Sequence, residues 1–216
     1  MFSILLAAFL IRAWGIDYGL PFEGITYKQV TFEESQEVLR AFKLGAGEYS
    51  WNFGKGGLYY FLFVEYGAYY AYSLAFGSVD NPREFALQIV ENRTPAYLMG
   101  RLTVALMGVL TCFVVYRIGS LIHDWRVGLG AAFLGATAYF HAVFSSVINV
   151  DIGMTLALWT SLLFYLIYER TRSIRYLVIS GILGGICIAF KLPGVVVIPV
   201  ILAAIVTASQ NPSTLR

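Results

Sequence analysis

Long apolar runs separated by short polar connections are the feature that most limits what this chain can fold into. After an apolar opening over 1–16, they lie at about 57–77, 96–116, 127–147, 152–168, 176–190 and 194–207. A helix of about 20 apolar residues crosses a hydrocarbon core of about 30 Å. The sequence therefore predicts an all-α, polytopic helical membrane protein with about six transmembrane helices.

The composition excludes several classes of protein. Hydrophobic residues make up 58% of the 216 residues and charged residues 13%, with a mean hydropathy of +0.70, which is too apolar for a soluble domain. The net charge is only +2 and the basic residues are scattered, so no nucleic-acid partner is expected. Cys112 and Cys187 lie inside apolar runs without paired spacing, which predicts small core residues.

Arginines indicate the orientation of the chain. The connection 117–126 carries two arginines and the connection 169–175 carries three, and such connections face the cytoplasm. If 127–147 and 152–168 form an up-down pair between them, the segment 148–151 lies on the outer side. The run 57–77 has Glu65 at its middle and many tyrosines, so we expect an interfacial or re-entrant helix there.

These expectations give a single transmembrane module over 1–216. Its parts are a first span at 1–16, an outer loop with amphipathic and interfacial helices at 17–95, five further spans within 96–207 and a polar tail at 208–216. A multi-pass protein of a bacterial or archaeal cytoplasmic membrane is expected, with membrane lipid around it and room for other membrane subunits as partners.

The stretch "TFEESQEVLRAFKLG" (31–45) predicts a juxtamembrane helix within the outer loop. Thr31 and Glu34 fit a capping box, and Glu33 in the first turn suits the helix dipole. Val38, Leu39 and Phe42 would form the apolar face. Both glutamates therefore have a structural explanation as well as a functional one.

Six charged residues from separate parts of the chain are expected at or near the outer surface: Glu33, Glu34, Lys55, Arg101, Asp151 and Lys191. Acids and cations held there suit a reaction on a lipid-linked phosphate, in which cations hold the phosphate and a carboxylate takes a proton. The alternatives are that Asp151 is a helix N-cap and that Arg101 and Lys191 reach outward to water. His141 and Glu65 have no evident partner in the sequence.

Six stretches in this order resemble the N-terminal module of the GT-C glycosyltransferases, in the branch of the protein O-mannosyltransferases and the lipid A aminoarabinose transferase. They are "IRAWGIDYGLPF" (11–22), "TFEESQEVLRAFKLG" (31–45), "FGKGGLYYFL" (53–62), "YLMGRLTVALMGVLTCFVVYRIG" (97–119), "VINVDIGMTLALW" (147–159) and "ISGILGGICIAFKLPGVVVIPV" (179–200).

The resemblance implies that this module is the N-terminal part of a longer family architecture. It also implies a site on the outer face that passes a sugar from a polyprenyl phosphate to an acceptor with inversion. It implies that Glu33 and Glu34 form the acidic pair, with Glu33 as general base, and that Asp151 orients groups or holds a divalent metal. Arg101, Lys55 and Lys191 would face the donor phosphate. Whether a metal takes part is left open.

Two departures keep a second interpretation open. This chain has Glu33 where the family usually has Asp, and Gly54 and Gly56 flank Lys55 where the family often has an acid and a proline. One extra methylene moves a carboxylate by about 1 Å, which is enough to slow a reaction that requires strict geometry. The alternative is a non-catalytic relative that serves as a structural or accessory subunit of a larger membrane complex.

Overall fold

The computed structural model describes residues 1–20, 32–49, 55–199 and 202, and these ranges are helical with no strand. The elements are α1 (Phe2–Ala13), α2 (Phe32–Gly45), α3 (Leu58–Ala75), α4 (Pro82–Glu91), α5 (Thr94–Ile122), α6 (Trp125–Thr137), α7 (Tyr139–Phe144), α8 (Val150–Thr171), α9 (Ile174–Phe190) and the 3₁₀ turn η1 (Leu192–Val196). The predicted all-α class is confirmed for the described residues.

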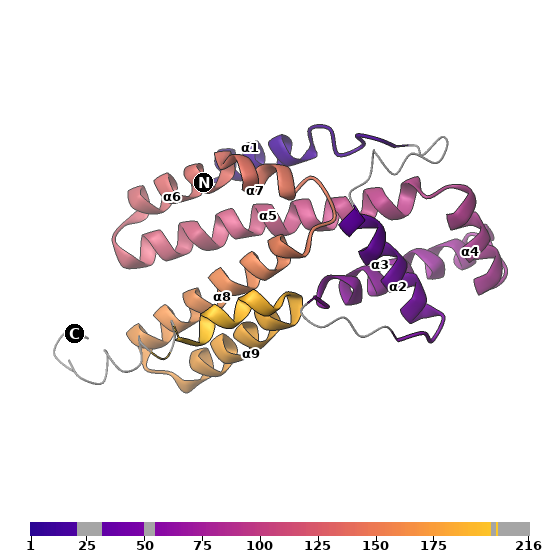
Figure 1. Ribbon diagram of the computed structural model, residues 1–216. Helices are drawn as coiled ribbons and strands as arrows, with labels where there is room; N and C mark the ends of the chain where they lie inside the picture. The colour runs from indigo at the N-terminus through magenta and orange to yellow at the C-terminus, as the bar shows by residue number, and fades with distance from the viewer. Residues whose placement is uncertain (21–31, 50–54, 200–201, 203–216) are drawn as a thin grey trace.

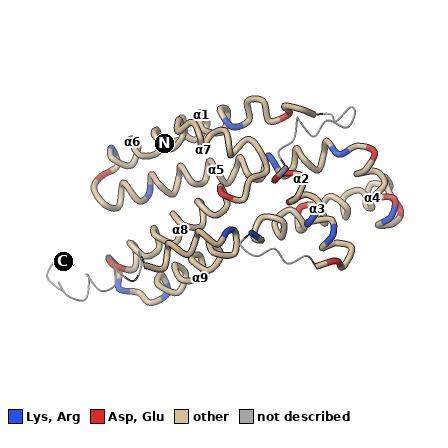
Figure 2. The backbone as a smooth tube through the Cα atoms, in the orientation of Figure 1, with Lys and Arg blue, Asp and Glu red and all other residues tan. Residues whose placement is uncertain are grey.

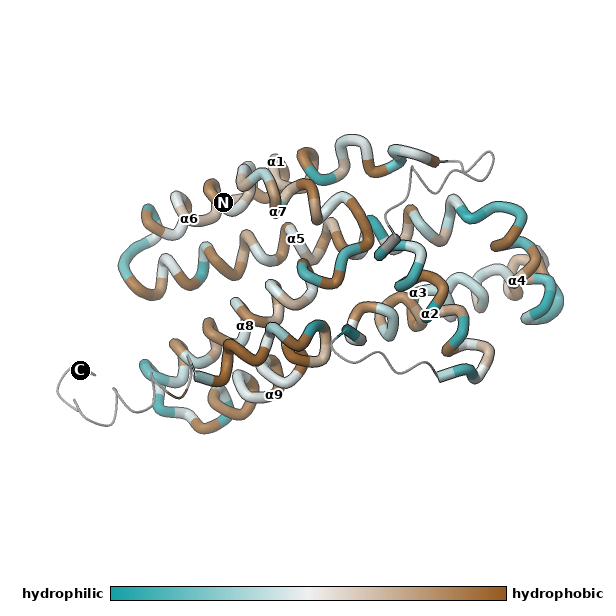
Figure 3. The backbone as a smooth tube through the Cα atoms, viewed as in Figure 1, coloured by the Kyte–Doolittle hydropathy of each residue, from teal (hydrophilic) through white to brown (hydrophobic). Residues whose placement is uncertain are grey.

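Helix α5 is the centre of the bundle. It packs against α1 and α6 on one side and α8 on the other, while α9 packs on α8 (Figure 1). Among the described helices, α5 and α8 are long and apolar enough to cross a membrane, and α1 and α9 are shorter apolar helices. Hydrophobic residues, coloured brown, recur along these helices in Figure 3. The predicted membrane character of the chain is supported, and the number of about six spans stays a prediction.

Small residues allow the closest helix contacts, as is common in membrane proteins. A Cβ placed on Gly119 of α5 would lie 2.9 Å from the Cα of Gly128 in α6. Ser161 of α8 and Ser180 of α9 each donate a hydroxyl to the other's carbonyl at 2.8 Å. Cys112 and Cys187 are buried and free, as expected for core residues.

The prediction of one continuous helix over 127–147 is wrong. Helix α6 ends at Thr137, Ala138 is extended, and α7 begins at Tyr139. The break frees carbonyls that a continuous helix would use, and the buried Arg12 guanidinium donates to those of Gly135 and Ala136 at 3.3 Å each. A side chain from α1 therefore compensates for the missing helical hydrogen bonds.

Helices α2, α3 and α4 form a separate layer at one end of the bundle (Figure 1). Phe42 of α2 stacks on Tyr66 of α3 at 4.7 Å between ring centroids, and the Tyr66 hydroxyl donates to the Ala96 carbonyl of α5 at 3.1 Å. The predicted apolar face of α2 is confirmed at Val38, which is buried, and wrong at Leu39, which is 49% exposed; Ala41 is buried as well.

Charged residues gather at the two ends of the bundle and in this layer, and are sparse between them (Figure 2). Helix α4 lies inside the predicted outer loop and was not expected. Its start is set by Asn81, whose side chain accepts from the Glu84 amide at 3.0 Å, with Pro82 in the first turn. Asn followed by Pro and an acid is an N-terminal signal that the sequence does contain.

Candidate active site

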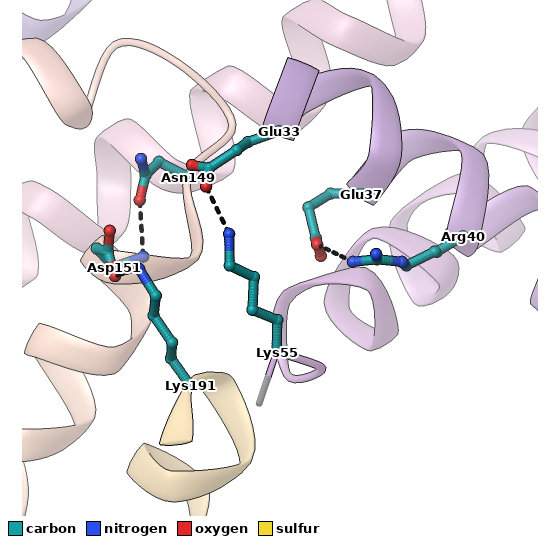
Figure 4. A network of polar contacts seen from close by, with 7 residues as sticks. All are labelled: Glu33, Glu37, Arg40, Lys55, Asn149, Asp151 and Lys191. Carbon is teal, nitrogen blue, oxygen red and sulfur yellow. Dashed lines mark hydrogen bonds and ion pairs between the residues drawn. The ribbon is translucent and has the colours of Figure 1, made fainter. Parts of the chain in front are cut away.

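Two ion pairs lie side by side where the α2–α4 layer meets the bundle. Glu33, in the first turn of α2, accepts from Lys55 at 2.5 Å, and Asp151, in the first turn of α8, accepts from Lys191 at 2.6 Å (Figure 4). The four side chains are between 23% and 43% exposed. We call Glu33, Lys55, Asp151 and Lys191 the charged quartet.

Backbone pairing brings the two lysines together. Lys55 and Lys191 form an isolated antiparallel bridge, and the Gly56 amide donates to the Phe190 carbonyl at 3.2 Å. This is a link between residues 136 positions apart in the chain, so sequence spacing alone could not reveal it. It places two ammonium-bearing residues from different halves of the protein on one short ladder.

Phe190 fits tightly between two glycines at this link. A Cβ on Gly57 would lie 2.8 Å from the Phe190 Cα, and a Cβ on Gly153 would overlap the Phe190 ring. The ring also stacks on Phe61 at 5.5 Å between centroids. These contacts fix how the segment of Lys191 lies against α8, which carries Asp151, and against the segment of Lys55.

Asp151 is not the N-cap of α8. That role belongs to Asn149, whose side-chain oxygen accepts from the Asp151 amide at 2.7 Å (Figure 4). The Asp151 carboxylate is therefore free of capping and is directed to Lys191. Together with Glu33, it places a carboxylate in the first turn of each of two helices, where the helix dipole favours negative charge.

Glu34 and Arg101 form a separate, buried pair. The Arg101 Nε and Nη2 donate to the two Glu34 oxygens at 2.8 and 3.1 Å, and the side chains are 1–2% exposed. Glu34 also accepts from the Ile148 amide at 2.9 Å. Arg101 donates further to the carbonyls of Ile16 and Tyr18 at 2.8 and 2.9 Å.

This pair joins four parts of the chain: the segment after α1, the first turn of α2, helix α5 and the segment before α8. Its donors and acceptors are used within the protein, so it explains Arg101 and Glu34 as structural residues. Each nitrogen of the Arg101 guanidinium donates to another described residue, and the donor-phosphate contact expected for Arg101 stays a prediction. The capping box with Thr31 lies outside the described residues.

Glu37 is a residue of this region that the sequence reasoning missed. It lies one turn after Glu33 on α2, is 2% exposed and accepts from Arg40 at 2.7 Å (Figure 4). Its second oxygen has no hydrogen-bond partner among the described residues. Burial raises the pKa of the Glu37 carboxyl, although the charges of Arg40 and Lys55 act in the opposite direction. The i, i+4 spacing from Glu33 was the available signal.

Two polar residues of the apolar runs do have partners. Glu65 accepts from the Thr103 hydroxyl at 2.9 Å, and His141 Nδ1 lies 2.7 Å from the Arg12 guanidinium. Among the described residues, no three His, Cys, Asp or Glu side chains lie close enough to hold a metal ion. The described residues therefore do not form a ready metal site.

Comparison with known proteins gives one match. A family model described as dolichyl-phosphate-mannose-protein mannosyltransferase matches residues 88–216, more than half of the chain. The matched region contains Arg101, Asp151 and Lys191. No curated protein and no solved structure shows significant similarity. On this match the chain belongs to the dolichyl-phosphate-mannose-protein mannosyltransferase family, within the GT-C membrane glycosyltransferases.

Proposed function

We propose that this chain moves a sugar from a polyprenyl-phosphate donor to an acceptor at the outer membrane face, with inversion at the anomeric carbon. The observation that carries the proposal is the charged quartet: backbone pairing sets Lys55 beside Lys191, and each lysine has its own carboxylate. Two cations and two helix N-terminal turns suit a phosphate. Two acids suit proton transfer and orientation.

In the proposed reaction, Lys55 and Lys191 bind the donor phosphate. Lys55 then gives up its contact with Glu33, which leaves the Glu33 carboxylate able to accept a proton. The acceptor oxygen or nitrogen attacks the anomeric carbon while the bond from that carbon to the phosphate oxygen breaks. Glu33 takes the acceptor's proton, and the polyprenyl phosphate leaves with the electron pair, stabilised by the two lysines.

Asp151 acts here as a positioning residue. Its carboxylate holds the Lys191 ammonium at 2.6 Å, and its own backbone is fixed by Asn149. Lys191 is therefore aimed before the donor arrives, which lowers the cost of ordering a flexible side chain at binding.

The test is transfer from dolichyl-phosphate mannose by the full chain in membranes, read as release of dolichyl phosphate. Glu33→Gln keeps the size of the side chain and removes the base, so we expect a loss of about 10²–10⁴-fold. Donor binding should remain. Glu91→Gln, an exposed change in α4, is the matched control and should leave transfer unchanged.

The alternative is a non-catalytic subunit in which the quartet serves only to join the α2–α4 layer to the bundle. One observation favours it: both acids are already paired with lysines. In that case neither the parent chain nor Glu33→Gln releases dolichyl phosphate. Loss of Glu33 would instead lower the stability of the chain or of a complex that co-purifies with it.

A further inference from the structure

A groove of about 260 Å³ runs between α5, α6 and α8, on the bundle side of the charged quartet. Its walls are mainly apolar and include Val115, Leu134 and Trp159, and His141 of α7 lines it as well. The hydroxyls of its two threonines, Thr111 and Thr155, donate hydrogen bonds to carbonyls of their own helices at 2.9 and 2.7 Å. The shape and chemistry suit a hydrocarbon chain with a polar group at one point.

His141 supplies that polar point, and Arg12 fixes its tautomer. A guanidinium can only donate, so the 2.7 Å contact makes His141 Nδ1 the acceptor. The imidazole hydrogen must then lie on Nε2. That nitrogen is buried and has no hydrogen-bond partner among the described residues, and an unpaired buried donor is costly. The imidazole therefore needs an acceptor from outside the described residues.

The same cluster carries a positive charge that no described carboxylate neutralises. Arg12 is fully buried, and it donates to the carbonyls of Ala8, Gly135 and Ala136 and to His141. Each of these acceptors is uncharged. An electron-rich oxygen next to His141 would lie in a favourable field.

The depth of the groove selects among lipid oxygens. Thr155 and Trp159 lie one and two turns beyond Asp151 on α8, about 6 and 12 Å along the helix axis. With Asp151 at the membrane surface, Thr155 and Trp159 lie at the depth just below the phosphate of a membrane lipid. A glycerophospholipid has ester carbonyls there. A polyprenyl chain has no oxygen below its phosphate, so it would leave the His141 donor unmet.

We propose that the groove binds one glycerophospholipid, with an acyl chain along Val115, Leu134 and Trp159 and an ester carbonyl accepting from His141 Nε2. Because Nε2 is buried, the imidazole has to turn on lipid binding so that Nε2 faces the groove. The site rests on the placement of Asp151 at the surface but is independent of sugar transfer. It is a lipid site beside the charged quartet, formed by α5, α6, α7 and α8.

The experiment compares two phosphatidylglycerols with the same head group and chain length, one diester and one diether, added to the delipidated full chain in detergent. Native mass spectrometry counts the lipid retained. The parent chain should retain about three- to tenfold more diester than diether lipid, as expected for one hydrogen bond. His141→Phe, which keeps a ring but has no N–H, should abolish that preference. His123→Phe, an exposed change beyond α5, should keep it.

Because His141→Phe also removes an acceptor of Arg12, a second variant is needed. Val115→Phe narrows the groove while leaving Arg12 and His141 unchanged, and it should reduce retention of both lipids with little change in thermal stability. Equal retention of diester and diether lipid by the parent chain would overturn the proposal. So would a preference that survives His141→Phe, or full displacement of the diester lipid by added polyprenyl phosphate.

Discussion

Glu33 and Glu34 are neighbours in the chain with the same side chain, yet they lie in opposite environments. Glu34 is 1% exposed and is held by Arg101 and by the Ile148 amide. Glu33 is 43% exposed and meets a single flexible lysine. Adjacent helical residues point about 100° apart, and that rotation separates a structural ion pair from one that a ligand can open.

The difference between the two pairs lies in what breaking them leaves behind. Removing one partner of the buried pair leaves an uncompensated charge away from water, whereas the partners in the charged quartet can turn to solvent. The first pair should therefore control folding and the second chemistry.

Arg101→Met should destabilise the chain by about 3–5 kcal/mol, because Glu34 would remain charged and buried. The contacts of Arg101 with the carbonyls of Ile16 and Tyr18 would also be lost. The readout is thermal unfolding of the purified chain in detergent, together with its yield in membranes. Lys55→Met is the matched change in the open pair.

Lys55→Met should cost less than about 1 kcal/mol, the usual worth of an exposed ion pair. It should nevertheless reduce sugar transfer strongly, because the Lys55 ammonium would no longer bind the donor phosphate. If Arg101→Met unfolds at the same temperature as the parent, the buried pair is not what holds α2 against α5. The contrast between the two pairs would then fail.

Gly153→Ala tests whether geometry at the charged quartet matters separately from charge. The new Cβ would overlap the Phe190 ring, which should move Lys191 relative to Lys55. A displacement of about 1 Å at a reacting centre can cost about 10²-fold in rate, with about 1–3 kcal/mol of stability lost to overpacking. Rate and thermal stability are both measured.

Gly185→Ala on α9 is the control, since an added Cβ there meets nothing within 4 Å. Adding Phe190→Leu to Gly153→Ala removes the ring atoms that clash and should restore part of the lost rate. Lack of any rescue would mean that Phe190 does not set the spacing of the two lysines.

The sequence predicted the parts that depend on local pattern. The helical class, the helix over 31–45 and the long helices α5 and α8 follow from apolar periodicity and run length. It also named every member of the charged quartet. What it missed depends on distant contacts: the break at Ala138 is compensated by Arg12, 126 positions earlier in the chain, and Asp151 is released from capping because Asn149 takes that role.

The pairing of charges was beyond sequence reasoning for the same reason. The local pattern suggests a different helix-end role for Glu33 and for Glu34, but it does not say which of them meets Arg101. The Lys55–Lys191 bridge likewise joins segments that only the complete fold brings together. Glu37 shows the remaining gap. Its spacing from Glu33 was visible, but its burial depends on how α2 packs against α3 and α5.

Glu37 gives the smallest and most specific prediction, because it lies between the two environments. Burial raises its carboxyl pKa in the folded chain, so the folded state holds the proton more tightly than the unfolded state. Stability should therefore fall as pH rises from the ordinary carboxyl range, about 4.3, through the raised folded pKa. Glu37→Gln removes this titration, so the variant should gain thermal stability relative to the parent above that window and lose the advantage below it.

Glu91→Gln, exposed on α4, should parallel the parent at every pH. Parallel curves for the parent and Glu37→Gln would instead place Glu37 with Glu33, among the carboxylates that water can reach.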